Sequence, residues 1–382
     1  MKSLNRIVQP VYMQMVEDLI EKINNGELKE GEHLISEKKL AKIYGISYMS
    51  VRKGLEELVK KGMIKKIAGK GNLILGSPSS IKKICVILHD TGSPFVQKLI
   101  KGMNEKILED NVTLHYFDSS GEEELELSIL SHLMEENFDG LIISFSSPYS
   151  CREKLTYFAE KGFPIVMLDS KVPGVNAPCI TSDNVGGARL LVSHLIDQGY
   201  RRIAVIFPHS QISTVRARLE GYRQVLKERI GELYPELECL GKIKFGVDEE
   251  KENEEWVRTQ VRKLIKMSKP PDAIFFEHDT FALYGLDELK KEGIKVPEEI
   301  GVVGFDDLPF ASHISPSLTT VKQYCEKMGY KARKLLCEML FSNEREKYSF
   351  LEIKLPVKLI VRESSKRKDI KWRVSKDRID FG

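Results

Sequence analysis

The chain has 382 residues, of which 42% are hydrophobic and 30% are charged. This length predicts two or three folding units, and this composition is typical of soluble globular proteins. No apolar run approaches the roughly 20 residues that span a bilayer. The N-terminal segment also lacks the uninterrupted apolar core of a signal peptide. We therefore expect a cytoplasmic protein with no membrane partner.

The charge is unevenly distributed, although the formal net charge is only +3. Residues 1–76 carry 14 Lys and Arg against 9 Asp and Glu, and residues 364–382 carry 7 against 3. A basic N-terminal part on an acidic body predicts a polyanionic partner at that end. The six cysteines form no C-x-x-C pair, so we expect neither a metal site nor a disulfide framework.

The first 76 residues have the pattern of a small helical domain with a hairpin. Residues 10–25 place apolar side chains every four positions, as one face of a helix does. Ser36 and Ser47 are favourable N-cap residues for two further helices, and Gly45 turns the chain between them. In order, we predict a helix over 10–25, a short helix from Ser36, a helix over 48–61, and strands over 63–67 and 72–75.

Residues 77–82 have the composition of a linker, and the periodicity changes after them. Short apolar runs that favour buried strands alternate with amphipathic segments that favour helices. This alternation occurs in two successive series, which predicts an α/β fold with two doubly wound, parallel-sheet lobes over residues 83–363. A ligand is then expected in the crevice at the carboxyl ends of the strands. The predicted strands of the two series cover residues 83–89, 112–117, 139–144 and 164–169, then 202–207, 272–277 and 301–305.

Residues 36–61 have the size and order of a helix-turn-helix, whose second helix can enter the major groove of double-stranded DNA. An arginine can bind guanine through two hydrogen bonds, which makes Arg52 the candidate base contact. Lysines at a helix N-terminus can hold a phosphate, and a small cationic hairpin tip can reach a minor groove. The predicted DNA-binding residues are Ser36, Lys38, Lys39, Ser47, Tyr48, Met49, Ser50, Arg52 and Lys53, with Lys70, Gly71 and Asn72 at the tip.

These residues resemble the winged helix-turn-helix domain of the GntR family. The matching stretches are "ISEKKLAKIYGIS", "SVRKGLEELVKKGMI" and "GKGN". The resemblance implies DNA contacts for Arg52 and Lys38. The family pattern often read as arginine-threonine-threonine is replaced here by Tyr48-Met49-Ser50, which leaves the operator sequence open.

Residues 82–363 resemble the LacI-type effector domain, which is itself similar to periplasmic sugar-binding proteins of type I. The resemblance is carried by several ordered motifs, among them "TSDNVGGARLLVSHLIDQGYRRIAVI", "HDTFALYGLDELKKEGIKVPEEIGVVGFDD" and "SLTTVKQ". A GntR-type reader joined to a LacI-type domain resembles the arabinose repressor family. This likeness implies a repressor of arabinose utilisation genes that L-arabinose releases from DNA, with no other cofactor.

Sugar hydroxyls donate and accept hydrogen bonds, so their pockets use carboxylates, amides, arginine and histidine together with an aromatic face. Such side chains follow the predicted strands, and the family motifs imply effector contacts for several of them. The predicted effector-binding residues are Phe95, Phe145, Asp183, Arg218, His278, Asp279, Asp306 and Gln323. Alternatives stay open for some: Asp183 and Asp279 can be helix caps, Arg218 a structural ion pair, and the two phenylalanines core residues. His278 stands where the family motif usually has asparagine.

The mechanism expected from this organisation is a homodimer on a pseudo-palindromic operator, with effector-driven closure of the two lobes. The linker is short and contains Pro78, so we do not expect the hinge helix that LacI-type repressors place in the minor groove. Alternatives are a response to another sugar or a nucleoside, activation in place of repression, and, more remotely, a solute-binding protein that does not bind DNA. Common catalytic motifs, such as a P-loop or G-x-S-x-G, do not occur, so we do not expect an enzyme. The basic tail over residues 364–382 is expected to be loosely docked, or else to contact DNA or a subunit.

Overall fold

The computed structural model describes residues 10–29, 31–67, 71–75, 81–133, 136–145, 149–241, 250–341 and 345–367. The chain divides into two compact units, Met1–Lys82 (unit 1) and Lys83–Gly382 (unit 2). Most of the predicted linker and most of the basic tail lie outside the described residues, as does Lys70.

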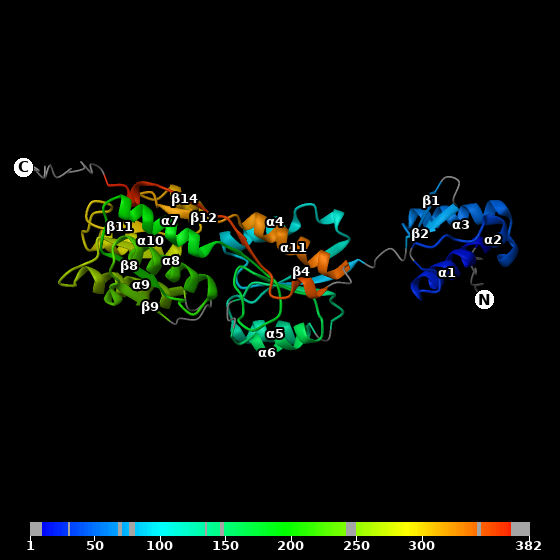
Figure 1. Ribbon diagram of the computed structural model, residues 1–382, viewed down its shortest axis with the longest axis horizontal. Coiled ribbons are helices and arrows are strands. Elements are labelled where there is room, and N and C mark those ends of the chain that lie inside the picture. The colour runs from blue at the N-terminus through cyan, green and yellow to red at the C-terminus, as the bar shows by residue number, and fades with distance from the viewer. Residues whose placement is uncertain are drawn as a thin grey trace, which may run out of the picture. The chain divides into compact units, whose positions relative to one another are not determined.

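Unit 1 consists of three helices and a two-stranded antiparallel sheet (Figure 1). Ser36 and Ser47 cap the second and third helices, because their hydroxyls accept hydrogen bonds from the backbone N–H groups of Lys39 and Ser50. Gly45 ends the second helix with φ of +62°, a left-handed conformation that glycine adopts without strain. The elements are α1 (Val11–Asn24), α2 (Glu37–Tyr44), α3 (Tyr48–Lys60), β1 (Ile64–Ile67) and β2 (Gly71–Ile74).

The core of unit 1 is formed by the apolar faces that the periodicity predicts. Met15 and Leu19 of α1 pack with Val51, Leu55 and Leu58 of α3, and all five are buried. Gly54 lies where α3 crosses α1, because a Cβ atom built there would meet the side chain of Met15. An additional bridge between His33 and Leu73 adds a third segment beside the hairpin. Unit 1 therefore folds as a winged helix-turn-helix.

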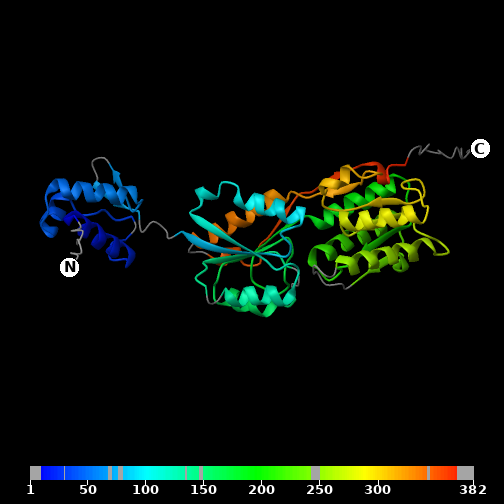
Figure 2. The same ribbon diagram turned by 180° about the vertical axis from the view of Figure 1, so that it is seen from behind.

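Unit 2 contains two α/β lobes, each with helices on both faces of a sheet. The first lobe has a six-stranded sheet in the order β13-β7-β6-β5-β3-β4, with α4 and α11 on one face and α5 and α6 on the other (Figures 1 and 2). Its elements are β3 (Lys82–Leu88), α4 (Pro94–Asn104), β4 (Val112–Asp118), α5 (Glu123–His132), β5 (Gly140–Ile143), α6 (Arg152–Glu160), β6 (Ile165–Leu168), β7 (Cys179–Ser182), α11 (Cys325–Phe341) and β13 (Glu352–Leu355).

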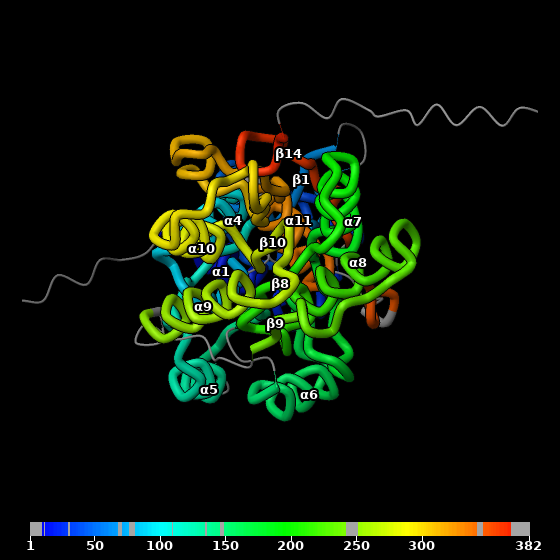
Figure 3. Tube along the Cα trace, turned by 90° about the vertical axis from the view of Figure 1, so that its left-hand side faces the viewer, coloured from blue at the N-terminus to red at the C-terminus, as the bar shows by residue number. Residues whose placement is uncertain are grey.

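The second lobe has a four-stranded parallel sheet in the order β11-β10-β8-β9. Helices α7 and α8 lie on one side of β8 and β10, and α9 and α10 lie on the other (Figure 3). The elements are α7 (Asn184–Asp197), β8 (Ile203–Phe207), α8 (Ser213–Arg229), β9 (Glu238–Leu240), α9 (Glu250–Ile265), β10 (Ala273–Phe276), α10 (Asp279–Lys291) and β11 (Gly301–Val303), followed by the antiparallel pair β12 (Thr320–Lys322) and β14 (Lys358–Ile360).

The chain passes between the lobes three times: after β7, after β12 and after β13. Helix α11 and strand β13 follow the second lobe in sequence but pack in the first, where β13 pairs in parallel with β7. The predicted α/β class with two parallel sheets and an N-terminal winged helix is confirmed. The sequence analysis did not predict α11 or β13, nor this return of the chain to the first lobe.

Two global features concern the described residues. None of their helices is both long enough and apolar enough to cross a membrane. The six cysteines are free thiols, of which Cys239 alone is half-buried and the rest are buried. Burial raises the pKa of the Cys85 thiol to about 12, so this side chain behaves as a small core residue.

Candidate nucleic-acid interface and ligand cavity

The N-terminal end of α3 presents the exposed polar face that the sequence predicts. Tyr48 and Met49 are exposed in its first turn, and Lys38 and Lys39 are exposed at the start of α2. Ser36 and Ser47 are already engaged as helix caps, and the Ser47 hydroxyl also lies 2.9 Å from that of Ser50. These serines fix the starts of the two helices, which leaves the longer side chains as the free donors of this face.

Arg52 is held in place by two neighbours within the same domain. Its Nε donates to Glu37 at 3.1 Å, and its terminal nitrogen donates to the Tyr48 hydroxyl at 3.3 Å. The side chain remains 49% exposed, so it can still reach a base edge. Glu37 was not among the predicted residues. The signal in the sequence that could have indicated it was an acid that precedes the arginine within the helix-turn-helix. Lys53 lies over the ring of Tyr12, 4.8 Å from its centre, and so faces α1.

The hairpin differs from the prediction at Asn72. This residue was expected at the tip, but it lies within β2, pairs with Lys66 and is only 6% exposed. Its carbonyl accepts a hydrogen bond from the backbone N–H of Leu34. Asn72 is therefore part of the sheet that supports the wing, whereas Gly71 is exposed at the start of the strand.

Unit 2 contains a cavity of about 400 Å³ lined by residues of both lobes. The first lobe contributes residues at the carboxyl ends of β3, β5 and β6, and the second lobe contributes the ends of β8 and β10 together with α8 and α9. This is the position that the alternation of strands and helices predicts. Six of the eight predicted effector residues line it: Phe95, Phe145, Arg218, His278, Asp306 and Gln323.

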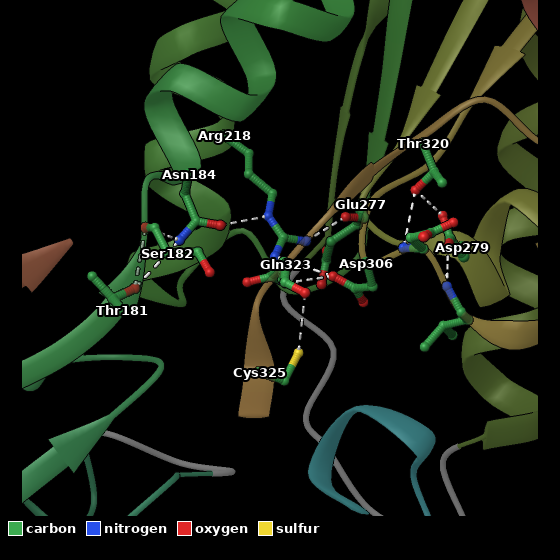
Figure 4. A network of polar contacts seen from close by, with 12 residues as sticks. Thr181, Ser182, Asn184, Arg218, Glu277, Asp279, Asp306, Thr320, Gln323 and Cys325 are labelled. Carbon is green, nitrogen blue, oxygen red and sulfur yellow. Dashed lines mark hydrogen bonds and ion pairs between the residues drawn. The ribbon is translucent and has the colours of Figure 1, made fainter. Parts of the chain in front are cut away.

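Arg218 is the centre of a buried polar network in this cavity (Figure 4). Only 5% of the residue is exposed. Its Nε donates to the side chain of Asn184 at 2.9 Å, and a terminal nitrogen donates to the carbonyl of Glu277 at 2.6 Å. Its second terminal nitrogen lies 3.6 Å from Asp306, and its guanidinium stacks on Phe305 at 3.8 Å. A buried cation requires such partners, and this one joins α7, α8 and the ends of two strands.

Asp306 follows β11 and turns its carboxylate toward Arg218 and Gln323. The Gln323 amide donates to it at 2.6 Å. Burial raises the pKa of Asp306 to about 6, against the opposing influence of Arg218 and Gln323. Its backbone has φ of +112°, a conformation that non-glycine residues rarely adopt. A side chain held in a strained turn inside a cavity fits a ligand-binding role. The neighbouring Asp307 instead forms an ion pair with Arg362 at 2.7 Å.

His278 provides a flat wall of the cavity. Its ring lies 3.8 Å, centre to centre, from that of Phe281. Burial lowers the pKa of His278 to about 3, so the ring is neutral and can both donate and accept hydrogen bonds. Beside it, Glu277 accepts hydrogen bonds from the ring and the backbone N–H of His209. Burial raises the pKa of Glu277, but the contact with His209 outweighs it and holds the pKa below the usual value.

Asp183 and Asp279 do not line this cavity. Asp183 caps α7 by accepting from the backbone N–H of Gly186 at 2.9 Å, and it faces a neighbouring cavity of about 690 Å³ on the outer side of α8. Its neighbour Asn184 contacts Arg218 in its place. Asp279 is fully buried, and its carboxylate accepts from Leu308 N and from the Thr320 hydroxyl at 2.8 and 2.6 Å, apart from the Arg218 group (Figure 4). Asp183 thus has the capping role that the sequence left open, and Asp279 joins the start of α10 to Leu308 and to strand β12.

Several residues of the cavity were missed by the sequence analysis. Asp169 directly follows β6, and Glu277 directly follows β10, so their position after a strand was an available signal. His89 and Asp90 follow β3 in the same way. Asn253 lies in the middle of an acidic, polar run and enters the cavity from α9. Nothing in that run distinguishes it from its neighbours.

Comparison with known proteins agrees with this organisation. Residues 11–74 match the model of the bacterial regulatory proteins of the gntR family, and residues 192–365 match a periplasmic binding protein-like domain. The arabinose metabolism transcriptional repressor of Geobacillus stearothermophilus is 26% identical over 368 residues, which cover 94% of this chain and 98% of that protein. The ribose operon repressor of Halalkalibacterium halodurans is 28% identical over 324 residues, which cover 81% and 91% of the two chains.

Among solved structures, a LacI family transcriptional regulator from Enterococcus faecium with bound ribose is similar in fold. Its TM-score is 0.60 at 24% identity, and the match covers 74% of this chain and 98% of that one. Both relatives are named as repressors, the matches cover 98% and 91% of their lengths, and this chain contains both domain types. The chain is therefore a transcriptional regulator that joins a gntR-family helix-turn-helix domain to a periplasmic binding protein-like domain.

Proposed function

We propose that this protein is a sugar-responsive transcriptional repressor that binds a palindromic operator as a homodimer and is released from it by L-arabinose. The observation that supports this most directly is the cavity of unit 2, in which Arg218, Asp306 and Gln323 form one buried polar network. The same chain carries a winged helix-turn-helix with an exposed arginine on its recognition helix. A ligand site and a DNA reader on one chain are the two parts that a ligand-controlled repressor requires.

The chemistry of the cavity favours an uncharged polyol. Among the described residues, its lining contains four carboxylates, Asp90, Asp169, Glu277 and Asp306, and one arginine or lysine, Arg218. Such a lining repels phosphate esters and carboxylates but suits hydroxyl groups, which can donate to the acids. The Phe281 and His278 rings offer a flat surface for the C–H face of a sugar ring. A volume of about 400 Å³ is at the small end of typical ligand pockets.

L-arabinose is the first candidate effector because the repressor that matches 94% of this chain is named for arabinose metabolism. Ribose is the second candidate. The relative from Halalkalibacterium halodurans is named for a ribose operon, and the Enterococcus faecium regulator has ribose bound. Both sugars are neutral pentoses, so both suit the acidic lining of the cavity.

Coupling between effector and DNA follows from the three chain passages between the lobes. Residues at two of them, Asn184 and Gln323, belong to the Arg218 network. A sugar bridging this network and the first lobe changes the angle between the lobes. In a dimer this shifts the spacing of the two winged helices, so that they no longer fit successive half-sites. An effector that couples in this way changes operator affinity by about 5- to 150-fold per site.

The test combines calorimetry with an operator-binding assay. A palindromic site is first selected from random duplex DNA, and its binding is followed by fluorescence anisotropy with L-arabinose, D-ribose, D-xylose or D-glucose. We expect saturable heat with one pentose and at least fivefold weaker operator binding in its presence. The proposal is contradicted if none of the sugars binds, or if a sugar binds but operator affinity stays constant. Sedimentation in the same buffer shows whether the DNA-bound form is a dimer.

A further inference from the structure

Three buried oxygen atoms in the cavity of unit 2 have no hydrogen-bond partner among the described residues. They are the Oδ1 of Asp169, the Oε1 of Gln323 and the Oδ1 of Asn253. They come from three separate places: the end of β6, the passage after β12, and helix α9. Buried polar atoms are almost always paired, so three unpaired oxygens around one cavity indicate that a ligand is the missing partner.

Asn253 is the most informative of the three. It lies in the first turns of α9, only 6% of the residue is exposed, and its Oδ1 has no hydrogen-bond partner in the part of the chain that the structure describes. Leaving a buried amide unpaired destabilises a fold, whereas an apolar side chain of similar size would not. The fold of α9 does not require an amide here, because Val257 and Val261 provide its buried apolar contacts. The amide therefore has no structural partner that explains its presence.

The orientation of Gln323 is fixed by its neighbour. Its Nε2 donates to Asp306, so its Oε1 is the atom left facing the cavity. Asp169 has a left-handed backbone with φ of +69°, and burial raises the pKa of its carboxyl group. Together the two residues offer two acceptors to the cavity. Asn253, from the other lobe, offers one acceptor at its unpaired Oδ1 and one donor group at its Nδ2.

We propose that Asn253 contacts the effector directly and determines which arrangement of sugar hydroxyls the protein accepts. This inference rests on the proposed function, because it names a further contact within the same ligand site. An amide that both donates and accepts fits a hydroxyl group of one orientation and leaves its epimer unpaired. Asp169 and Gln323 hold the sugar through hydroxyls that donate to them. Asn253, on α9, then contacts a further hydroxyl and distinguishes its orientation.

The experiment replaces Asn253 by leucine (N253L) in the full-length protein, with Q260L as the matched control. Gln260 lies on the same helix and is not part of the cavity lining. Titration calorimetry measures the affinity for L-arabinose and D-ribose, and thermal unfolding is measured without sugar. For N253L we expect about 10- to 100-fold weaker binding of the preferred pentose, a smaller ratio between the two pentoses, and an unfolding temperature that is unchanged or higher. Q260L should bind both sugars like the wild type.

Each other outcome overturns the assignment. If N253L binds both pentoses like the wild type, Asn253 does not contact the effector. If N253L unfolds at a markedly lower temperature, its amide has a structural role, and weaker binding then has another cause. If the wild type itself binds no sugar of the panel, the proposed function fails and the assignment of Asn253 fails with it. The wild-type titration thus separates the failure of the function from the failure of this residue.

Discussion

The two units of this protein arrange their candidate functional residues in opposite ways. In unit 1, the candidates on α2 and α3 are mostly exposed, and Arg52 keeps half of its side chain in solvent although it pairs with Glu37. In unit 2, Arg218 and Gln323 are buried, and both contact Asp306, whose side chain is 13% exposed. The candidate DNA-binding face thus lies outside the core of unit 1, which includes Met15, Leu55 and Leu58. The ligand cavity is itself part of the interior of its unit.

Because of this difference, function and stability depend on different residues in unit 1 but on the same residues in unit 2. Substitutions on the exposed face of α3 should change DNA affinity and leave folding intact. Substitutions in the Arg218 network should change both, because removing one partner leaves another buried charge uncompensated. Asp279 and Asp183, which lie near the cavity without lining it, should affect stability alone. The following predictions test these distinctions, beginning with the largest expected effect.

The largest effect is expected for Arg218→Met. The substitution leaves Asp306 and the carbonyl of Glu277 without their cationic partner. Breaking a buried pair in this way lowers the free energy of unfolding by about 3–5 kcal/mol. Urea unfolding measures this loss, and calorimetry should detect no sugar binding. Arg216→Met on the same helix is the control, because Arg216 is exposed and does not line the 400 Å³ cavity. Unchanged sugar affinity in R218M would place the ligand outside this network.

Asp279→Ala should be nearly as destabilising, yet should spare sugar binding. It removes the acceptor for two buried donors, Leu308 N and the Thr320 hydroxyl. Each unpaired donor lowers the free energy of unfolding by about 1–3 kcal/mol. We expect a loss of roughly 2–4 kcal/mol in urea unfolding. The folded fraction should retain wild-type affinity for the pentose. Asp183→Ala, which loses only a helix cap, should lose about 1 kcal/mol. A selective loss of sugar affinity in either variant would restore that aspartate as a ligand contact.

Arg52→Ala should weaken operator binding by about 1–3 kcal/mol, which corresponds to roughly 5- to 150-fold. Its unfolding free energy should stay within about 0.5 kcal/mol of the wild type, because Arg52 is exposed. Anisotropy with the selected operator measures the first quantity and urea unfolding the second. Lys60→Ala, at the far end of the same helix, is the control. Equal loss of affinity in both variants would mean that α3 contributes charge and no base contact.

The smallest effect is a pH dependence set by Asp306. The pKa of this buried carboxyl is raised to about 6, so below pH 6 it takes up a proton and no longer attracts sugar hydroxyls as an anion. Sugar affinity should therefore fall by up to about tenfold between pH 7 and pH 5. His278, with a pKa of about 3, stays neutral over this range. Asp169 also has a raised pKa and acts in the same direction.

The stability of the free protein should respond to Asp306 with the opposite sign. Because the folded-state pKa lies above the reference value of 3.8, the folded protein binds this proton more tightly than the unfolded chain does. The contribution of Asp306 to stability is thus present below about pH 4 and is lost as the pH rises through about 6. Asp306→Asn should reduce both trends to the part that Asp169 contributes. Calorimetry at four pH values and parallel unfolding curves separate them, and a flat affinity profile in the wild type would exclude Asp306 as a ligand contact.

The sequence by itself determined the local elements and the two kinds of unit. Ser36, Ser47 and Gly45 mark helix ends through bonds within a few residues, and the period of apolar side chains marks buried strands and helix faces. Residues that directly follow strands, such as Asp306 and His278, could be placed in the cavity because the carboxyl ends of parallel strands meet at one edge. These signals depend on residues that are close in the chain, so they can be recognised from the sequence alone.

Only the tertiary structure decided which polar residues share a site. Asp183 and Asn184 are adjacent in the chain, yet the first caps a helix and the second contacts Arg218, 34 residues away. Asp279 and Asp306 both follow strands, but the bonds of Asp279 to Leu308 and Thr320 hold its carboxylate away from the cavity. The parallel bridge between Asp306 and Lys322 brings Gln323 to Asp306. Asn253 enters the same cavity from a helix whose sequence gives no sign of it. Such contacts join residues that are distant in the chain, so their geometry exists only once the chain has folded.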